Sequence, residues 1–369
     1  MCEYLVMFKT LTPLWTGDAA GECNGLRETG ILGSLRWWYE ALVRGLGGYV
    51  CDPTDKDQRC DFGKKKSGET KDSDQGIHDV IDGSICPACQ LFGCTGWARK
   101  FRIEVEGGIA VPEVSVRTRK KRNGKYLTRK TSGLMSSDPI AMRVVPLRKI
   151  EEDEWILLNR TLDIIANYGA LGARTSQGCG VVSIVESDLP FGGGSVKDVK
   201  FRGHKKASSQ NLNNFPNMKN FFFFKLKLGF RDVISNLINK EVFWTHASDD
   251  KFFTRVRGNW EKLWQDFSIL PIAFHARDAL RISLSKNGIS ENVLGKIGMG
   301  SKLFVSHGYK IDSGTVEMRI WGYGVGNEVK DRIKHRIKNA LEGTLFAHDN
   351  FLQCCELVEE KAGADILGD

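Results

Sequence analysis

Residues 30–48 read GILGSLRWWYEALVRGLGG, and they set the frame for the first half of the chain. Apolar residues recur here at the spacing of one helix face: Leu35, Trp38, Leu42 and Leu46. Charged residues form a second stripe, which we expect to face outward: Arg36, Glu40 and Arg44. The pattern predicts a helix over 31–46, and the following glycine pair should end it.

The segments around this helix supply the other elements of one domain. Periodicity predicts strands over 3–12, 101–114, 142–147 and 181–185 and a second helix over 154–168. The first strand has apolar residues on both of its faces: Tyr4, Val6 and Phe8 on one, and Leu5 and Met7 on the other. It is therefore expected to be buried on both faces. The order strand, helix, two strands, helix, strand is that of a ferredoxin-like domain, a layout related to RNA-recognition modules.

The second half contains the same types of element. A strand is expected over 220–230, an aromatic-striped helix over 249–267 and a further strand over 279–285. Two alternating runs, 303–311 and 315–323, surround Asp312-Ser313-Gly314 and predict a β-hairpin. Asn327 then begins another helix. We therefore predict an α+β protein with two ferredoxin-like domains.

A glycine-rich and polar stretch marks the boundary between these domains. Gly192–Ser195 and Ser208–Asn214 together favour a linker over 191–217. The N-terminal domain should then span 1–190, with insertions at about 49–84 and 115–141, and the C-terminal domain 218–369.

Composition is that of a folded chain with locally concentrated positive charge. Apolar residues make up 41% and charged residues 27%, which is too balanced for wholesale disorder. The formal net charge is +8, yet the window 117–130 alone holds eight basic residues and no acidic one. Lys120, Lys121 and Arg122 at its centre should attract a polyanion without regard to sequence. The alternative is a solvated loop with no ligand.

The start of the chain lacks the charged and apolar regions of a signal peptide, and no apolar run approaches the roughly 20 residues that span a bilayer. We therefore expect a cytoplasmic protein whose ten cysteines are mostly reduced.

In that compartment clustered cysteines point to a metal. Cys86-x2-Cys89 is half of a tetrahedral zinc site, which Cys60 and Cys94 are expected to complete. Cys51 and His78 are further candidates. The alternative is that Cys94 is buried as a small apolar residue.

A glycine-rich loop, LGARTSQGCGVV at 171–182, lies between a predicted helix and a predicted strand. Its backbone N–H groups and Arg174 could hold phosphate oxygens. It has neither the Gly-Lys-Ser/Thr of a Walker A motif nor the strand-to-helix position of a dinucleotide-binding turn. The loop residues predicted to contact RNA are Arg174, Gln177, Gly178 and Gly180, and the alternative is a tight turn without ligand.

Three motifs taken together resemble the RAMP superfamily, and within it the first-subunit family of the Cmr complex, the type III-B CRISPR effector: GILGSLRWWYE at 30–40, CPACQLFGCTGW at 86–97 and GCG at 178–180. LGKIGMGSKL at 294–303 is similar to the family more weakly. The resemblance implies two ferredoxin-like domains, other RAMP subunits as partners, contact with guide or target RNA, and no nuclease activity of this subunit.

Arg36 and Trp37 suit contact with a phosphate and stacking on a base. The glycine loop is expected to lie near them, so that one surface binds RNA. The alternative is that Arg36 pairs with Glu40 and Trp37 packs against a strand.

These observations favour an RNA-binding subunit that is not an enzyme. A RAMP endoribonuclease that processes guide RNA is the first alternative, although the seven histidines are scattered; His275 and His335 are two that have a basic residue within two positions. A zinc-stabilised module that binds other proteins and no RNA is the second.

Overall fold

A computed structural model describes residues 3–18, 20–62, 85–122, 125–201, 215–243, 250–284, 289–296, 299–345 and 351–368. Side chains at 117–127, 250–256, 289 and 343–345 lie outside this description. The molecule is a mixed α/β structure with antiparallel sheets. None of the helices traced in these ranges is both long and apolar enough to cross a membrane.

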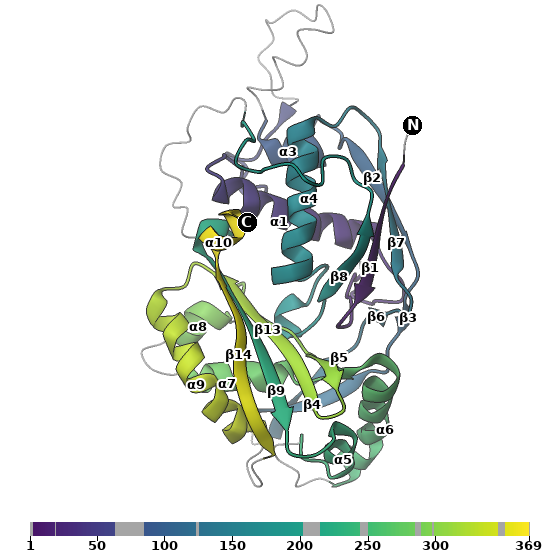
Figure 1. Cartoon of the computed structure of the whole chain (residues 1–369), viewed down its shortest axis with the longest axis vertical. Coiled ribbons are helices and arrows are strands. Elements are labelled where there is room, and N and C mark those ends of the chain that lie inside the picture. Colours follow the sequence, from purple (N-terminus) through teal and green to yellow (C-terminus); the bar gives the residue numbers. More distant parts are fainter. Residues whose placement is uncertain are drawn as a thin grey trace, which may run out of the picture.

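The first sheet has the strand order β2-β7-β1-β8 (Figure 1). Its strands are β1 (Tyr4–Thr10), β2 (Phe101–Glu106), β7 (Ile140–Pro146) and β8 (Val182–Ser187). Helix α1 (Glu28–Gly45) follows β1 and α4 (Glu152–Tyr168) follows β7. Both helices pack on the sheet, and every strand pair is antiparallel. This arrangement is the ferredoxin-like topology that the element order predicts.

Strand β1 corrects one expectation. Val6, Phe8 and Thr10 are buried, whereas the alternating residues Leu5 and Met7 are only half-buried and Lys9 is exposed. Successive side chains of a strand point to opposite faces, so only one face of β1 is fully covered. The prediction that both faces are buried is wrong.

The second sheet has the order β10-β12-β13-β9-β14, with β11 also paired to β13. Its strands are β9 (Phe221–Phe230), β10 (Ile269–Leu270), β11 (Leu303–Val305), β12 (Gly308–Asp312), β13 (Thr315–Tyr323) and β14 (Leu352–Ala362). Helices α7 (Ala273–Ser283) and α9 (Asn327–Leu345) pack together beside it (Figure 1). The order β12-β13-β9-β14 again matches a ferredoxin-like fold. Shorter helices complete this half: α5 (Ile234–Asn239), α6 (Asp250–Phe267) and α8 (Ile289–Leu294).

Two local predictions in this half have opposite outcomes. The hairpin is confirmed, since Asp312 pairs with Thr315 across a tight turn. The strand expected over 279–285 is wrong, because 279–283 form the last part of α7. Ala276, Ala279, Leu280 and Ser283 recur at helical spacing and are buried, so the contacts of a helix face override the short alternation of RISLS.

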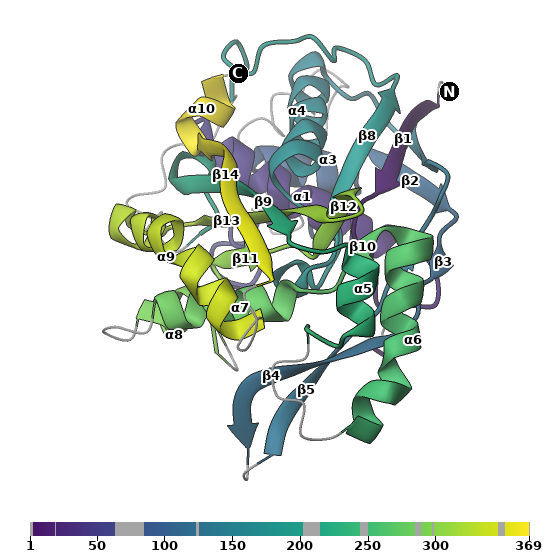
Figure 2. The ribbon, with the colours of Figure 1, turned by 60° about the horizontal axis from the view of Figure 1, so that its bottom comes forward.

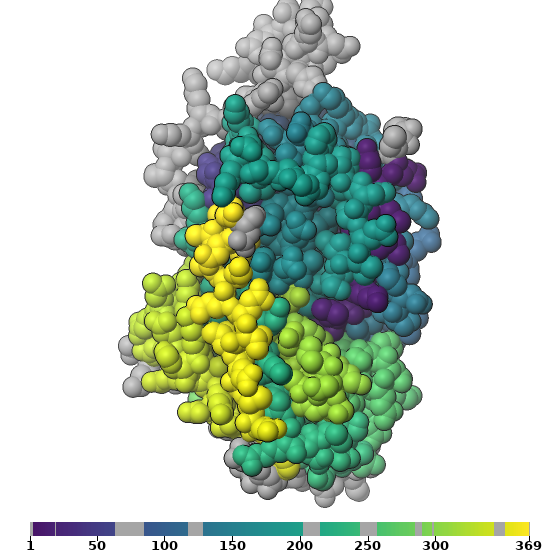
Figure 3. Space-filling view, in the orientation of Figure 1, coloured from purple at the N-terminus to yellow at the C-terminus, as the bar shows by residue number. Residues whose placement is uncertain are grey.

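Each half of the chain contributes a segment to the hydrophobic core of the other half. The window 114–131 forms a two-stranded ribbon, β4 (Val114–Arg122) and β5 (Lys125–Thr131), that extends beside α6 (Figure 2). The base of the ribbon, Val114 and Val116, is buried in the second core. In return, β14 leads into α10 (Gly363–Gly368), whose Ile366 is buried in the first core. In Figure 3, β14 and α10 form one yellow band that runs from the second half onto the first.

The boundaries set at 191–217 therefore stay predictions. Residues 192–195 of the expected linker lie against α4, where a Cβ on Gly194 would come within 2.4 Å of Ile156. Residues 202–214 lie outside the described ranges.

Two histidines, His275 and His307, are buried in the second half, where burial disfavours the charged imidazolium. Burial lowers the pKa of His275 to about 4 and that of His307 to about 3. His275 Nε2 lies 2.8 Å from the carbonyl oxygen of Phe243, and His307 Nδ1 accepts a hydrogen bond from the Ala273 N–H at 3.2 Å. Both rings are therefore neutral in the folded protein at pH 7.

We predict that stability falls as the pH is lowered from 6.5 towards 4. The unfolded chain takes up protons on these histidines near pH 6.5, whereas the folded chain does not, so each should contribute a slope of about 1.4 kcal/mol per pH unit in this window. Urea unfolding at several pH values should show a shallower slope for His275→Gln, whose amide can still donate to Phe243. An identical slope for His275→Gln and the unaltered chain would contradict the assignment.

Candidate nucleic-acid interface and cysteine cluster

The glycine loop between α4 and β8 owes its shape to left-handed backbone positions. Arg174 has φ 55°, Gly178 φ 110° and Gly180 φ 95°, and residues 175–177 form a single 3-10 turn. A Cβ at position 180 would lie 2.2 Å from the Leu171 carbonyl oxygen, so only glycine fits there. The Gly180 N–H donates to the Pro13 carbonyl at 2.9 Å. This end of the loop is held by the first half of the protein.

The other end of the loop lies against the second half. The carbonyl of Gly178 accepts a hydrogen bond from the His307 N–H at 3.1 Å. A Cβ on Gly178 would lie 2.6 Å from the Cβ of Ala273 and 2.7 Å from the His307 ring. Both loop glycines are buried, and their packing alone requires them to be glycine.

The polar residues of the loop are more accessible. Gln177 is half-buried and lines a large groove. Arg174 stacks on Trp15, with the guanidinium carbon 3.2 Å from the ring centroid. This stacking orients the Arg174 side chain at the edge of the loop.

The groove beside the loop has a volume of about 1100 Å³. We call it the basic groove. Five segments line it: β5, the glycine loop, α7, α8 and the residues that follow α8. Its principal lining residues are Arg129, Ser176, Gln177, Phe274, Arg277, Asp278, Arg281, Ile282, Glu291, Lys296 and Met299.

Arg277 holds three walls of this groove in place. Its guanidinium donates to the carbonyl oxygens of Ser176 at 2.9 Å, Leu303 at 3.3 Å and Leu294 at 2.8 Å. Burial lowers the pKa of Arg277 to about 10, so the side chain still carries its charge at pH 7. Hydrogen bonds from a charged donor are stronger than neutral ones, and these three connect the glycine loop, β11 and the end of α8.

The groove has an excess of positive charge. Arg129, Arg281 and Lys296 are exposed, and they add to buried Arg277. The acidic residues of the lining are Asp278, which accepts a hydrogen bond from Arg281 at 2.8 Å, and Glu291. Apolar surface is present too, because Ile282 is 42% and Met299 45% exposed. Positive charge beside accessible apolar groups suits a ligand with phosphates and flat rings.

Lys120, Lys121 and Arg122 lie on β4 of the ribbon whose other strand carries Arg129. Their backbone is strand rather than loop, while their side chains lie outside the described part of the chain. Their predicted contact with RNA stays a prediction.

Arg36 and Trp37 contact protein groups in this structure. Arg36 Nε donates to Glu40 Oε1 at 2.8 Å, and Trp37 packs against Phe304 and Tyr323. The stripe of charged residues on α1 is not an outward face, since Glu40 and Arg44 are buried. Arg44 donates to the Pro216 carbonyl and stacks on the Phe215 ring, and both of these residues are distant from α1 in sequence.

The glycine loop approaches another side of α1 than the one that carries Arg36. Trp38 Nε1 donates to the carbonyl of Ala170, just before the loop, at 2.9 Å. Side chains two residues apart are rotated by about 200° about the helix axis. Arg36 therefore faces away from the contact that Trp38 makes. Arg36 and Trp37 therefore lie outside the candidate interface, and their predicted contact with RNA stays a prediction.

Four buried cysteines form a cluster beside α1: Cys51, Cys60, Cys86 and Cys89. Their sulfur atoms all lie within 4.8 Å of one another. A zinc ion bound to four thiolates at about 2.3 Å would place the sulfurs about 3.8 Å apart, so small side-chain movements suffice. The N–H of Cys86, just before α3 (Pro87–Phe92), points at the Cys60 sulfur at 3.3 Å. The cluster can hold a metal ion.

The predicted ligand set is corrected at one position. Cys94 does not belong to the cluster; it is half-exposed, and its sulfur donates to the Thr95 carbonyl at 3.7 Å. Cys51 takes its place, with its sulfur 3.6 Å from that of Cys89. Position 94 follows the left-handed Gly93, φ 88°, which ends α3 and turns the chain away. The other candidate, His78, lies outside the described residues.

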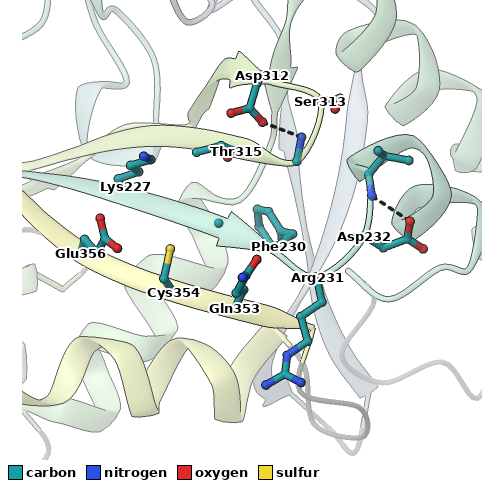
Figure 4. A pocket seen from close by; sticks show the side chains of 13 residues that line it. Lys227, Phe230, Arg231, Asp232, Asp312, Ser313, Thr315, Gln353, Cys354 and Glu356 are labelled. Atoms are coloured by element: carbon teal, nitrogen blue, oxygen red, sulfur yellow. Dashed lines mark hydrogen bonds between the residues drawn. The ribbon is translucent and has the colours of Figure 1, made fainter.

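A second hollow lies at the end of the second sheet, around the β12–β13 turn, with a volume of about 600 Å³ (Figure 4). Its two aspartates, Asp232 and Asp312, accept hydrogen bonds from the local backbone. Asp312 accepts from the Gly314 N–H and Asp232 from the Val233 N–H, each at 2.8 Å. Asp232 also pairs with Lys240. These contacts account for the aspartates as turn-forming groups.

Sequence reasoning missed four basic residues of the groove: Arg129, Arg277, Arg281 and Lys296. Arg129 belongs to the basic window and Lys296 to the glycine-containing segment 294–303, so both lie within recognised features. Arg277 and Arg281 stand four apart on one helix face, a signal that the mistaken strand at 279–285 obscured.

Comparison with known proteins gives one family. Residues 7–183 match the model of the RAMP superfamily. No curated protein matches the chain.

Several solved structures are distantly similar. Cmr1 from Pyrococcus furiosus, in its apo form, has 14% identity and a TM-score of 0.38, with 88% of each chain covered. A chain of the type III-B Cmr-beta complex bound to cognate target RNA has 12% identity and a TM-score of 0.40, covering 92% of this chain and 99% of that one. A chain of a type IV-B CRISPR complex has 15% identity and a TM-score of 0.34, covering 54% and 97%.

We predict that Gly178→Ala destabilises the protein. The added methyl group meets Ala273 and His307 at a left-handed φ, which should cost roughly 1–3 kcal/mol. Thermal unfolding should show a lower Tm than for Gly193→Ala, which changes an exposed loop glycine where an added Cβ would have no other atom within 4 Å. Equal Tm values for the two variants would contradict the packing described for Gly178.

Proposed function

Because residues 7–183 belong to the RAMP superfamily, we propose that the chain is an RNA-binding subunit of a type III-B (Cmr) CRISPR effector complex. The observation that carries the proposal is the basic groove. It joins exposed cationic side chains to accessible apolar groups, and both halves of the protein contribute to it. Other RAMP subunits and guide or target RNA are the proposed partners.

The proposed binding mode follows from the charges. Arg129, Arg281 and Lys296 contact phosphates along one strand, an interaction that does not depend on base identity. Ile282 and Met299 provide exposed apolar surface against which bases pack. Sequence selection then comes from guide pairing rather than from these side chains.

The proposed subunit has no catalytic role. His275, the histidine that would best support the alternative of a guide-processing ribonuclease, is buried, and its pKa is lowered to about 4. A general acid or base needs access to the substrate and a pKa closer to neutrality. His335 is exposed on α9, and none of the described side chains of this helix lines the groove.

We further propose that the cysteine cluster holds one structural zinc ion. Four protein ligands fill a tetrahedral shell and leave no open position for a substrate, as in structural rather than catalytic zinc sites. The ion would fasten 51–60 and 86–93 to each other beside α1.

Replacing Arg129, Arg281 and Lys296 with glutamine should weaken binding of single-stranded RNAs of different sequence about equally. The dependence of log K on log salt should flatten by about 2, or 0.7 for each lost phosphate contact. Fluorescence anisotropy at several salt concentrations measures both effects. The matched control neutralises three exposed cations on the first half, Arg102, Arg143 and Lys149.

An equal loss in the control would mean that net charge, not the groove, binds RNA. A second variant, Lys120, Lys121 and Arg122 to alanine, tests the ribbon in the same assay. If neither the groove nor the ribbon variant alters affinity in the free chain or the assembled complex, the module that binds only proteins becomes the better description.

The purified chain should not cleave RNA, with or without divalent metal. The readout is the length of end-labelled RNA after prolonged incubation. Specific cleavage that disappears in His275→Ala would favour the ribonuclease alternative instead.

Elemental analysis of protein prepared without added metal should find about one zinc per chain. Cys86→Ser should lose it, because one of four ligands is removed. Cys94→Ser is the matched control and should keep it. Zinc-free but folded protein, or loss of zinc in Cys94→Ser, would contradict the proposed ligand set.

A further inference from the structure

Arg36 connects α1 to the cysteine cluster. Its Nη2 lies 3.3 Å from the Cys89 sulfur, within reach of an N–H···S hydrogen bond. The same guanidinium donates through Nη1 to the Gly93 carbonyl at 2.9 Å and through Nε to Glu40 at 2.8 Å. Three acceptors on three different residues fix the plane and the direction of the Arg36 guanidinium group.

The acceptors themselves are held in place. Gly93 ends α3 at φ 88°, where a Cβ would lie 2.9 Å from the Arg99 nitrogen, so its backbone has little room to move. Glu40 is buried and also pairs with Arg44 at 3.4 Å. Arg36 is therefore preorganised to direct one N–H at the Cys89 sulfur.

Charge explains why a cation belongs there. Zn²⁺ with four thiolates carries a net charge of −2, and a buried charge is costly unless it is paired and hydrogen-bonded. Among the described side chains, Arg36 is the cation with a hydrogen bond to a cluster sulfur. Glu40, which pairs with Arg36 at Nε, offsets only part of that positive charge.

Resting on the proposed zinc ion, we propose that Arg36 is a positioning residue of this metal centre: its guanidinium donates to the Cys89 thiolate, stabilises the negative charge of the tetrathiolate and so tightens metal binding. This role explains why a long cationic side chain occupies the stripe of α1 that faces the cluster.

The test compares metal binding by the full chain and two variants. Arg36→Met removes the donor but keeps the length of the side chain. Arg44→Met is the matched control, because it removes a buried cation of the same helix whose described hydrogen bonds go to Glu40 and to the Pro216 carbonyl rather than to a cluster sulfur. Zinc affinity is measured by competition with a chromophoric chelator. Cobalt(II) absorption then reports the sulfur-to-metal charge-transfer band.

Arg36→Met should bind zinc at least tenfold more weakly, the size of effect expected for an outer partner of a metal ligand. Its charge-transfer band should move to lower energy, because a thiolate without its hydrogen-bond donor gives up electron density more readily. Arg44→Met should keep the affinity and the band of the unaltered chain even if its Tm falls. Arg36→Lys, which retains the charge, should lie between the unaltered chain and Arg36→Met.

Unchanged affinity or an unchanged band in Arg36→Met would overturn this role while leaving the zinc ion in place. Should Arg36→Met not fold, the same two readouts on Arg36→Lys decide, because it too must differ from the unaltered chain in the predicted direction. Failure of the unaltered chain to bind zinc or cobalt would instead refute the zinc ion itself.

Discussion

The buried guanidinium of Arg277 is the interaction on which the rest of the site depends. It satisfies three carbonyl oxygens at once, and these belong to the glycine loop of the first half and to two segments of the second. Beside it, Gly178 and His307 bring the two backbones into direct contact. A groove lined by both halves can keep its shape only if they are held in one relative position, and these contacts provide that constraint.

Because the two halves are held in one position, different residues of the glycine loop serve packing and ligand binding. The glycines are required for close backbone approach, which leaves Gln177 and the neighbouring cations to face the groove. Electrostatic attraction there has a local origin, since a formal charge of +8 on a chain of this size is modest. The exchange of segments between the cores, with the ribbon on one side and α10 on the other, adds further apolar contact between the halves.

Much of the fold follows from the sequence because its signals are local. Helical periodicity identifies α1 and α4, and alternation around Asp312 identifies the hairpin. What local pattern cannot show is which distant segment covers a face. The charged stripe of α1 reads as outward, yet the loop at Gly93 and the chain at Pro216 cover it. Proximity in sequence also fails to identify the fourth cysteine of the cluster. Cys94 is near Cys89 in sequence, but it is Cys51 whose sulfur lies beside that of Cys89 in the cluster.

The most direct test is to map the RNA contact itself. A single-stranded RNA containing 4-thiouridine can be crosslinked to the full chain, and to the assembled complex, and the adducts assigned to residues by mass spectrometry. We expect adducts on the segments that line the basic groove, around Gln177, Ile282 and Met299. Adducts confined to other surfaces, such as β14 or the hollow around Asp312, would contradict the central claim that this groove binds RNA.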